Sequence, residues 1–358
     1  PRSTLFPYTT LFRSDVCLFA DFQMTLKEFQ KAFPKEKEAI ARFFNFINSK
    51  DFLGVYSKVK KDSFKLMLDS FVDSDSFKDV LYGLLCGVLG SNPSEIPAWV
   101  GIETLKEFFL DPGYCPKGGM KYFSDNLFLY FKKSGGEAIL SHRVKKVSAK
   151  GSRIISILTE EEEYRSDYFV ANIDPFQLAR LLEERIGKIL RPSSSLSPTL
   201  SAFLVFLGLT PSYKCKSFER GCIRDFRNIK NDLKCLLRQE TNALCGGILV
   251  YPSSVWNPTA NFDDGKMAIQ IYKLAFFKEK NFWVKNAEYY MKELISDVSS
   301  IIPYLEKNIQ VKSLATPLTF SSYSGNEMGA VLGKMVTFKS FKNIYFSRSF
   351  FYDNLFFA

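Results

Sequence analysis

The sequence holds a single histidine, His142, among its 358 residues. This scarcity excludes multi-histidine metal sites and leaves at most one histidine-dependent triad or acid–base pair. The seven cysteines form no Cys-x-x-Cys pair, so we expect reduced thiols and neither a disulfide framework nor a zinc ribbon. The longest apolar run, residues 80–90, is shorter than the roughly 18 residues of a membrane span. These features predict an intracellular protein, cytoplasmic or peripheral to a membrane.

The charges favour no nucleic-acid partner. Lys and Arg total 48 against 38 Asp and Glu, which gives a formal net charge of +10. Short basic runs such as residues 58–61 alternate with acids, as on solvated helix faces, and form no continuous basic surface. We therefore expect no nucleic-acid binding, and the sequence gives no oligomeric state.

Aromatic residues are abundant, at 16% of the chain, with 36 Phe and 17 Tyr. An AT-rich coding sequence and an apolar substrate cavity explain this excess equally well. The hydrophobic and charged fractions, 46% and 24%, are those of ordinary globular proteins. At roughly 150 residues per domain, the length suggests about two domains.

Both ends of the sequence are unusual. Residues 4–14 (TLFPYTTLFRS) resemble the translation of a sequencing-library adapter. We therefore expect residues 1–14 to be an artefact that packs against nothing, and the natural chain to be cut upstream of Asp15. Residues 346–358 are rich in aromatics without regular alternation, and we expect degraded sequence after about residue 346.

The hydrophobic spacing predicts a mixed fold. From residue 25 to 104, apolar residues recur every three or four positions, as Leu26, Phe29 and Phe33 do, which predicts helices. Further helices are expected at residues 120–134, 176–189 and 283–302. Strands are expected at residues 138–140, 144–148, 154–158, 168–172, 200–209, 267–275, 309–314 and 341–346. This order predicts an α/β (α+β) protein.

Several segments together resemble one family. Residues 116–120 (PKGGM), the Gly135-Gly136 pair, a strand with Val144 and Val147, and residues 170–175 (VANIDP) occur in this order. They are similar to the FAD-dependent phytoene desaturase, carotenoid isomerase and retinol saturase family. Further similarity covers nearly all of residues 20–345 in the family's order.

The resemblance implies an incomplete FAD/NAD(P)-binding Rossmann-like domain with an inserted helical and β-sheet substrate domain. The helical part of the substrate domain is expected at residues 15–112, and its sheet and helix at 191–303. The FAD-binding domain is expected at residues 113–190 and 304–358. The family's strand-GxGxxG-helix unit is absent from this sequence, and so is its Gly-rich segment after a strand resembling residues 342–346. The implied cofactor is FAD, with NAD(P) also possible, and this chain is expected to be inactive.

The resemblance also nominates site residues. Val144 would contact the adenine through its backbone, although valine there is equally a β-strand residue. Asn172 and Asp174 would lie near the cofactor, although a turn and a helix N-cap explain them as well. Lys117, Gly118 and Gly119 are candidates for substrate binding, and the two glycines also suit a turn that needs positive φ.

The implied activity is hydride or hydrogen transfer on a polyene or isoprenoid lipid, carotenoid- or retinoid-like, by desaturation, isomerisation or saturation. The alternatives are a flavin amine oxidase-like enzyme and a non-catalytic fragment that binds lipid or membrane. His142 is expected to be an exposed strand residue and no base. One helical set is expected to line a lipid tunnel, to contact a membrane or to pack in the core: Phe43, Phe44, Phe71, Leu84 and Leu85.

Overall fold

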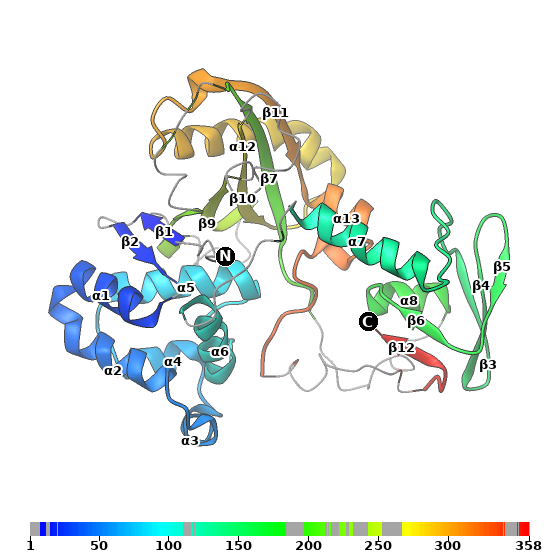
Figure 1. Ribbon diagram of the computed structural model, residues 1–358, viewed down its shortest axis with the longest axis horizontal. Helices are drawn as coiled ribbons and strands as arrows, with labels where there is room; N and C mark the ends of the chain where they lie inside the picture. Colours follow the sequence, from blue (N-terminus) through cyan, green and yellow to red (C-terminus); the bar gives the residue numbers. More distant parts are fainter. Residues whose placement is uncertain are drawn as a thin grey trace.

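The computed structural model describes residues 8–11, 15–19, 21–109, 116, 119–183, 197–211, 213, 215, 222–226, 229–231, 243–252, 267–338, 340, 349 and 351–357. Figure 1 shows a layer of helices, a large sheet with one long helix against it, and a smaller unit that holds the C-terminal strand. Each part has its own cluster of buried apolar side chains.

The helical layer comprises α1 (Phe22–Ala32), α2 (Lys37–Ile47), α3 (Phe52–Val59), α4 (Phe64–Asp69), α5 (Asp75–Leu89) and α6 (Ala98–Phe109). The side chains of Asp21, Asp51, Ser63 and Ser74 accept hydrogen bonds from backbone N–H groups in the first turns of α1, α3, α4 and α5. Gly90 ends α5 in the left-handed conformation, with φ +60°. The prediction of helices between residues 25 and 104 is confirmed.

Aromatic rings fill the interior of this layer. The Phe29 ring centroid lies 5.3 Å from that of Phe77 and 5.5 Å from that of Phe44. Phe43, Phe44, Leu84 and Leu85 are fully buried in the same cluster, and Phe71 packs against it. Core packing is therefore the role of this set. No helix among the described residues is both long and apolar enough to cross a membrane.

The large sheet has the strand order β11-β7-β10-β9-β8-β1-β2. Its strands are β1 (Tyr8–Leu11), β2 (Asp15–Leu18), β7 (Ser201–Leu209), β8 (Ile223–Asp225), β9 (Leu244–Tyr251), β10 (Met267–Ala275) and β11 (Ile309–Ala315). Neighbours are antiparallel except β1 and β8, which run parallel. Helix α12 (Lys280–Ser299) packs against the sheet, where the rings of Trp283 and Phe203 are stacked with centroids 5.5 Å apart. The strands predicted at residues 200–209, 267–275 and 309–314 and the helix predicted at 283–302 are confirmed.

Two features of this sheet differ from the sequence-based expectations. Residues 8–11 pair with both β2 and β8, whereas we expected residues 1–14 to pack against nothing. Strand β11 pairs with β7, so the sheet includes residues on both sides of the boundary expected at residue 304. Backbone pairing of strands distant in the chain leaves little trace in local hydrophobic spacing.

The smaller unit begins with helix α7 (Gly119–Lys133) and continues with the antiparallel strands β3 (Lys146–Lys150), β4 (Arg153–Leu158) and β5 (Glu163–Arg165). Strand β6 (Phe169–Ala171) leads into α8 (Pro175–Leu181) and pairs in parallel with β12 (Leu355–Phe357). Helix α13 (Pro317–Ser324) and the short helix η5 (Glu327–Gly329) follow β11. Helix α8 ends at Leu181 and Glu183 has φ +56°, so the helix predicted at residues 176–189 ends earlier than expected; residues 184–189 lie outside the described residues. The predictions for residues 120–171 agree with α7, β3, β4 and β6 within a few residues, except in one place.

That exception is the strand predicted at residues 138–140, where the structure has no strand. The carbonyl of Leu140 accepts a hydrogen bond from Nδ1 of His142, 2.8 Å away, in place of a strand partner. The prediction was wrong because this side-chain contact stabilises a local bend that hydrophobic spacing does not reveal.

The C-terminal residues are part of the folded core, where we expected degraded sequence. Tyr352, Asn354 and Leu355 are 1 to 2% exposed. The amide of Asn354 donates to the carbonyls of Ile154 (2.9 Å) and Asp167 (3.0 Å), and its oxygen accepts from the N–H of Ile154 at 2.9 Å. The side chain of Asn354 anchors the C-terminal strand, and a single polar residue produces no periodic hydrophobic pattern in the sequence. The strand expected at residues 341–346 lies outside the described residues.

Candidate functional site

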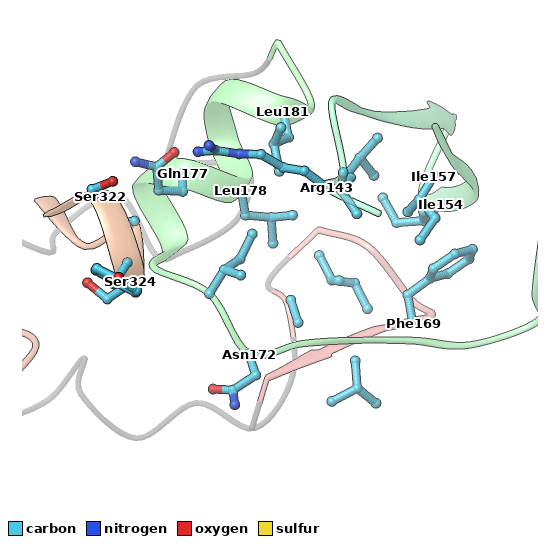
Figure 2. Close-up of a pocket in the computed structure, with 18 residues that line it drawn as sticks. Arg143, Ile154, Ile157, Phe169, Asn172, Gln177, Leu178, Leu181, Ser322 and Ser324 are labelled. Atoms are coloured by element: carbon cyan, nitrogen blue, oxygen red, sulfur yellow. The ribbon is translucent and has the colours of Figure 1, made fainter. Parts of the chain in front are cut away.

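A cavity of about 520 Å³ lies in the smaller unit, between its strands, α8 and the end of α13 (Figure 2). Its volume is within the range of about 300–1,000 Å³ typical of small-molecule sites. The wall is mainly apolar, with the buried side chains of Val147, Ile154, Leu178 and Leu355 among its members. The cavity therefore suits a ligand with a flat or apolar body.

Strand geometry and the β6–α8 turn position two predicted site residues at this cavity. Val144 lies just before β3, where its half-buried side chain packs on the apolar cluster of the unit. Asn172 follows β6 directly and is exposed at the cavity. The structure thus brings together Val144 and Asn172, which are far apart in the sequence. Whether they contact a cofactor stays a prediction.

Asp174 lies beside the cavity and is not one of its lining residues. Its Oδ1 accepts from the N–H of Phe176 at 2.8 Å, so it is the N-cap of α8. Its Oδ2 lies 3.0 Å from Nζ of Lys334, which also contacts Glu327 Oε2 at 3.0 Å and lies 4.2 Å from the centroid of the Phe176 ring. The helix-cap interpretation of Asp174 is confirmed, with an ion pair that the sequence did not indicate.

The substrate-binding candidates are only partly described. Lys117 and Gly118 lie outside the described residues. Gly119 is buried at the start of α7 and has φ +81°. Its positive φ agrees with the turn that the sequence predicted, and Gly119 does not line the cavity.

His142 precedes β3, in an unpaired segment and not in the strand that we expected. Its Nε2 lies 2.9 Å from Oε2 of Glu161. The hydrogen bond to the Leu140 carbonyl, followed by the charge of Glu161, raises the pKa of His142 above its usual value. The side chain is thus held in an ion pair and is not positioned as a base at the cavity.

Sequence reasoning missed four polar residues that line the cavity: Arg143, Gln177, Ser322 and Ser324. Arg143 is the neighbour of Val144, and this adjacency was the available signal. The other three come from α8 and α13, which the fold brings together from about 145 residues apart. No local pattern could have indicated their proximity.

The described part of the chain contains no candidate metal site, and two of its buried thiols are unreactive. No group of three His, Cys, Asp or Glu side chains there could hold a metal ion. Burial raises the pKa of the Cys86 thiol and raises that of Cys222 to about 12, so both thiols stay protonated near neutral pH. These cysteines are inert core residues.

Comparisons with solved structures show the fold. An oxidoreductase from Methanosarcina mazei is similar with a TM-score of 0.63 and 14% identity, over 100% of this chain and 75% of that one. A triple mutant of putrescine oxidase from a redesign of cofactor binding has a TM-score of 0.58 and 13% identity, over 100% and 76%. A Pyrococcus furiosus protein has a TM-score of 0.57 and 12% identity, over 87% and 68%. No protein-family model and no curated protein sequence matches the chain.

The chain therefore shares the mixed helix-and-sheet fold of these structures. At 12 to 14% identity, the similarity establishes the architecture, and function has to be argued from the site.

Proposed function

We propose that this chain forms the substrate domain and part of the cofactor domain of an FAD-dependent oxidoreductase, and that the cavity beside Val144 holds the adenine end of FAD. One observation carries the proposal. Val144 and Asn172, nominated by resemblance to FAD-dependent enzymes, line the same cavity in a chain that shares the fold of oxidoreductases.

The residues present fit the adenine end of this cofactor. Val147, Ile154 and Leu178 provide an apolar wall for a flat ring, and Val144, whose backbone would contact the adenine, lines the same cavity. Bound FAD would supply the redox chemistry, and the protein would supply position and exclusion of water. The pyrophosphate fits less well, because the sequence lacks the GxGxxG turn whose backbone N–H groups bind phosphates at a helix N-terminus.

The proposed substrate is a polyene or isoprenoid lipid, carotenoid- or retinoid-like. The support is the resemblance of residues 116–120 and 170–175 to the phytoene desaturase family, together with similarity along residues 20–345. Oxidation of an amine is the second candidate, because putrescine oxidase shares the fold. Anaerobic bleaching of flavin in a reconstituted protein by a polyene or by a diamine would decide between them.

Visible absorption tests the cofactor. The chain as it stands should retain little flavin after gel filtration, whereas a chain extended by a strand-GxGxxG-helix unit and a Gly-rich C-terminal segment should retain it. The loss of several charge-assisted hydrogen bonds, at roughly 1.5 to 3 kcal/mol each, removes most of a micromolar affinity of about 8 kcal/mol. A colourless extended chain would contradict the proposal, and a stoichiometrically yellow short chain would contradict our account of the phosphates.

A cavity-blocking variant tests the location. Gln177 is half-buried on α8 and lines the cavity, so the larger side chain of Gln177→Trp should obstruct it. In the extended chain, Gln177→Trp should lower flavin retention and Gln177→Ala should preserve it. Equal retention by both variants would place the flavin elsewhere.

A further inference from the structure

Residues 142–146, at and just before the start of β3, include four basic or titratable side chains, and one of them lacks a close carboxylate partner among the described residues. His142 pairs with Glu161 at 2.9 Å, Lys145 with Glu160 at 2.5 Å and Lys146 with Glu183 at 3.3 Å. Within the described part of the chain, no carboxylate lies within 4.0 Å of the Arg143 guanidinium. Arg143 thus has no described ion-pair partner at contact distance. The contact with Lys145 lowers the pKa of Glu160, and the charge of Arg143 adds to this lowering from a longer range.

The Arg143 side chain lies along the cavity. Figure 2 shows it extended past Leu178 toward Gln177 on α8. The other polar side chains in the wall, such as Asn172, Gln177 and Ser322, are uncharged, and the described lining includes no Asp or Glu. The cavity therefore combines an apolar interior with one positive charge that no acidic lining residue offsets.

A cavity of this kind selects a ligand with an apolar ring and an anionic group. A guanidinium is planar and presents paired N–H donors that match a phosphate or carboxylate. Arg143 is an exposed residue, so solvent screens part of the contact and its strength should depend on salt. Val144 is the next residue, so a ring held at Val144 has its substituents within reach of the neighbouring arginine.

We propose that Arg143 is a specificity-determining residue that contacts a phosphate carried by the adenine-containing ligand, so that the cavity prefers a nucleotide to a nucleoside. The inference rests on the proposed function, because it takes the adenine ring as the occupant of the apolar part. It adds a charged contact that neither the resemblance nor the fold comparison provides.

Binding of three small probes to the chain as it stands tests this inference. Isothermal titration with adenosine, 5′-AMP and 2′-AMP should show at least one nucleotide bound about tenfold more tightly than adenosine, as expected for one partly exposed charge-assisted contact. The two nucleotides distinguish the ribose position of the phosphate. Raising the salt concentration should reduce the preference for the nucleotide, because added ions screen the contact between Arg143 and the phosphate.

Three variants separate a specific role from a general effect of charge. Arg143→Gln should abolish the preference for the nucleotide and leave adenosine affinity unchanged, and Arg143→Lys should retain part of the preference. Lys146→Gln removes one positive charge from the same stretch, at a residue paired with Glu183, and should keep the preference. Circular dichroism establishes that each variant is folded.

The outcomes distinguish the inference from the proposed function. If adenosine and both nucleotides bind equally, or if Arg143→Gln keeps the preference, the role of Arg143 is overturned while the adenine site stands. If none of the three probes binds the wild-type chain, or if Gln177→Trp leaves their binding unchanged, the adenine site itself is wrong and the inference fails with it.

Discussion

Lys334 and Asp174 form an ion pair, with 3.0 Å between Nζ and Oδ2, that joins the segment after α13 to the N-cap of α8. The two side chains are only 11% and 5% exposed. The same ammonium contacts Glu327 at 3.0 Å. Since α8 and α13 both contribute to the cavity wall, this pair holds together two sides of the candidate site.

Replacing Lys334 should destabilise the fold. Lys334→Met leaves Asp174 nearly buried without its cation, and we expect the free energy of unfolding to fall by about 3 kcal/mol, the lower end for removal of one partner of a buried pair. Urea unfolding followed by circular dichroism measures the change. Lys121→Met is the control, because the Lys121–Asp125 pair on α7 is 85% and 54% exposed and its loss should cost less than about 0.5 kcal/mol. Equal effects would show that the Lys334 contacts are not structurally important.

Gly247 on β9 should not tolerate a side chain. An added Cβ would lie 2.2 Å from Cδ1 of Phe226, whose side chain is 2% exposed. We expect Gly247→Ala to lower the free energy of unfolding by roughly 1–3 kcal/mol through overpacking. Gly208→Ala on β7 is the matched control, since its Cβ would lie 3.4 Å from that of Val311. The same Cβ would lie 2.9 Å from the backbone oxygen of Asp225, so Phe226→Leu should relieve part of the effect of Gly247→Ala. An effect that ignores residue 226 would show that the Phe226 contact is not its cause.

Asn354 should be required for the C-terminal strand. Asn354→Ala removes three hydrogen bonds to backbone groups of Ile154 and Asp167 and leaves buried polar atoms without partners, at a cost of roughly 2–3 kcal/mol. Asn126→Ala on α7 provides the comparison, because that amide is exposed and contacts the carbonyl of Tyr122 alone. Thermal unfolding of both variants would show the difference, and a neutral Asn354→Ala would indicate that β12 is dispensable.

The stability contributed by His142 should depend on pH. The hydrogen bond to Leu140 and the charge of Glu161 raise the pKa of His142 in the folded chain. A raised folded-state pKa means that the contribution is fully present below the unfolded pKa of about 6.5 and is lost as pH rises through the folded pKa. The difference in unfolding free energy between wild type and His142→Gln should thus be larger at about pH 5.5 than at pH 8.5. A difference that is constant or grows with pH would contradict this assignment.

Local hydrophobic spacing predicted many of the elements. Strand β10 has the bounds expected, and β7, β11, α7 and α12 agree within a few residues. Val144 and Asn172, which the resemblance nominated, both line one cavity, and their contact with a cofactor stays a prediction. These successes depend on side-chain periodicity and on short motifs, which are properties of contiguous residues.

The sequence by itself determined most helices between residues 25 and 104, the strands β7, β10 and β11, and the scarcity of histidine chemistry. Only the tertiary structure decided that β11 lies beside β7, that β12 lies beside β6, and that Lys334 reaches Asp174. The same holds for the ion pairs of His142 with Glu161 and of Lys145 with Glu160, which leave Arg143 without a carboxylate at contact distance among the described residues. The physical reason is that periodicity reports which face of an element is buried, whereas these strand partners and the Lys334–Asp174 pair join residues far apart in the chain, which no local pattern specifies.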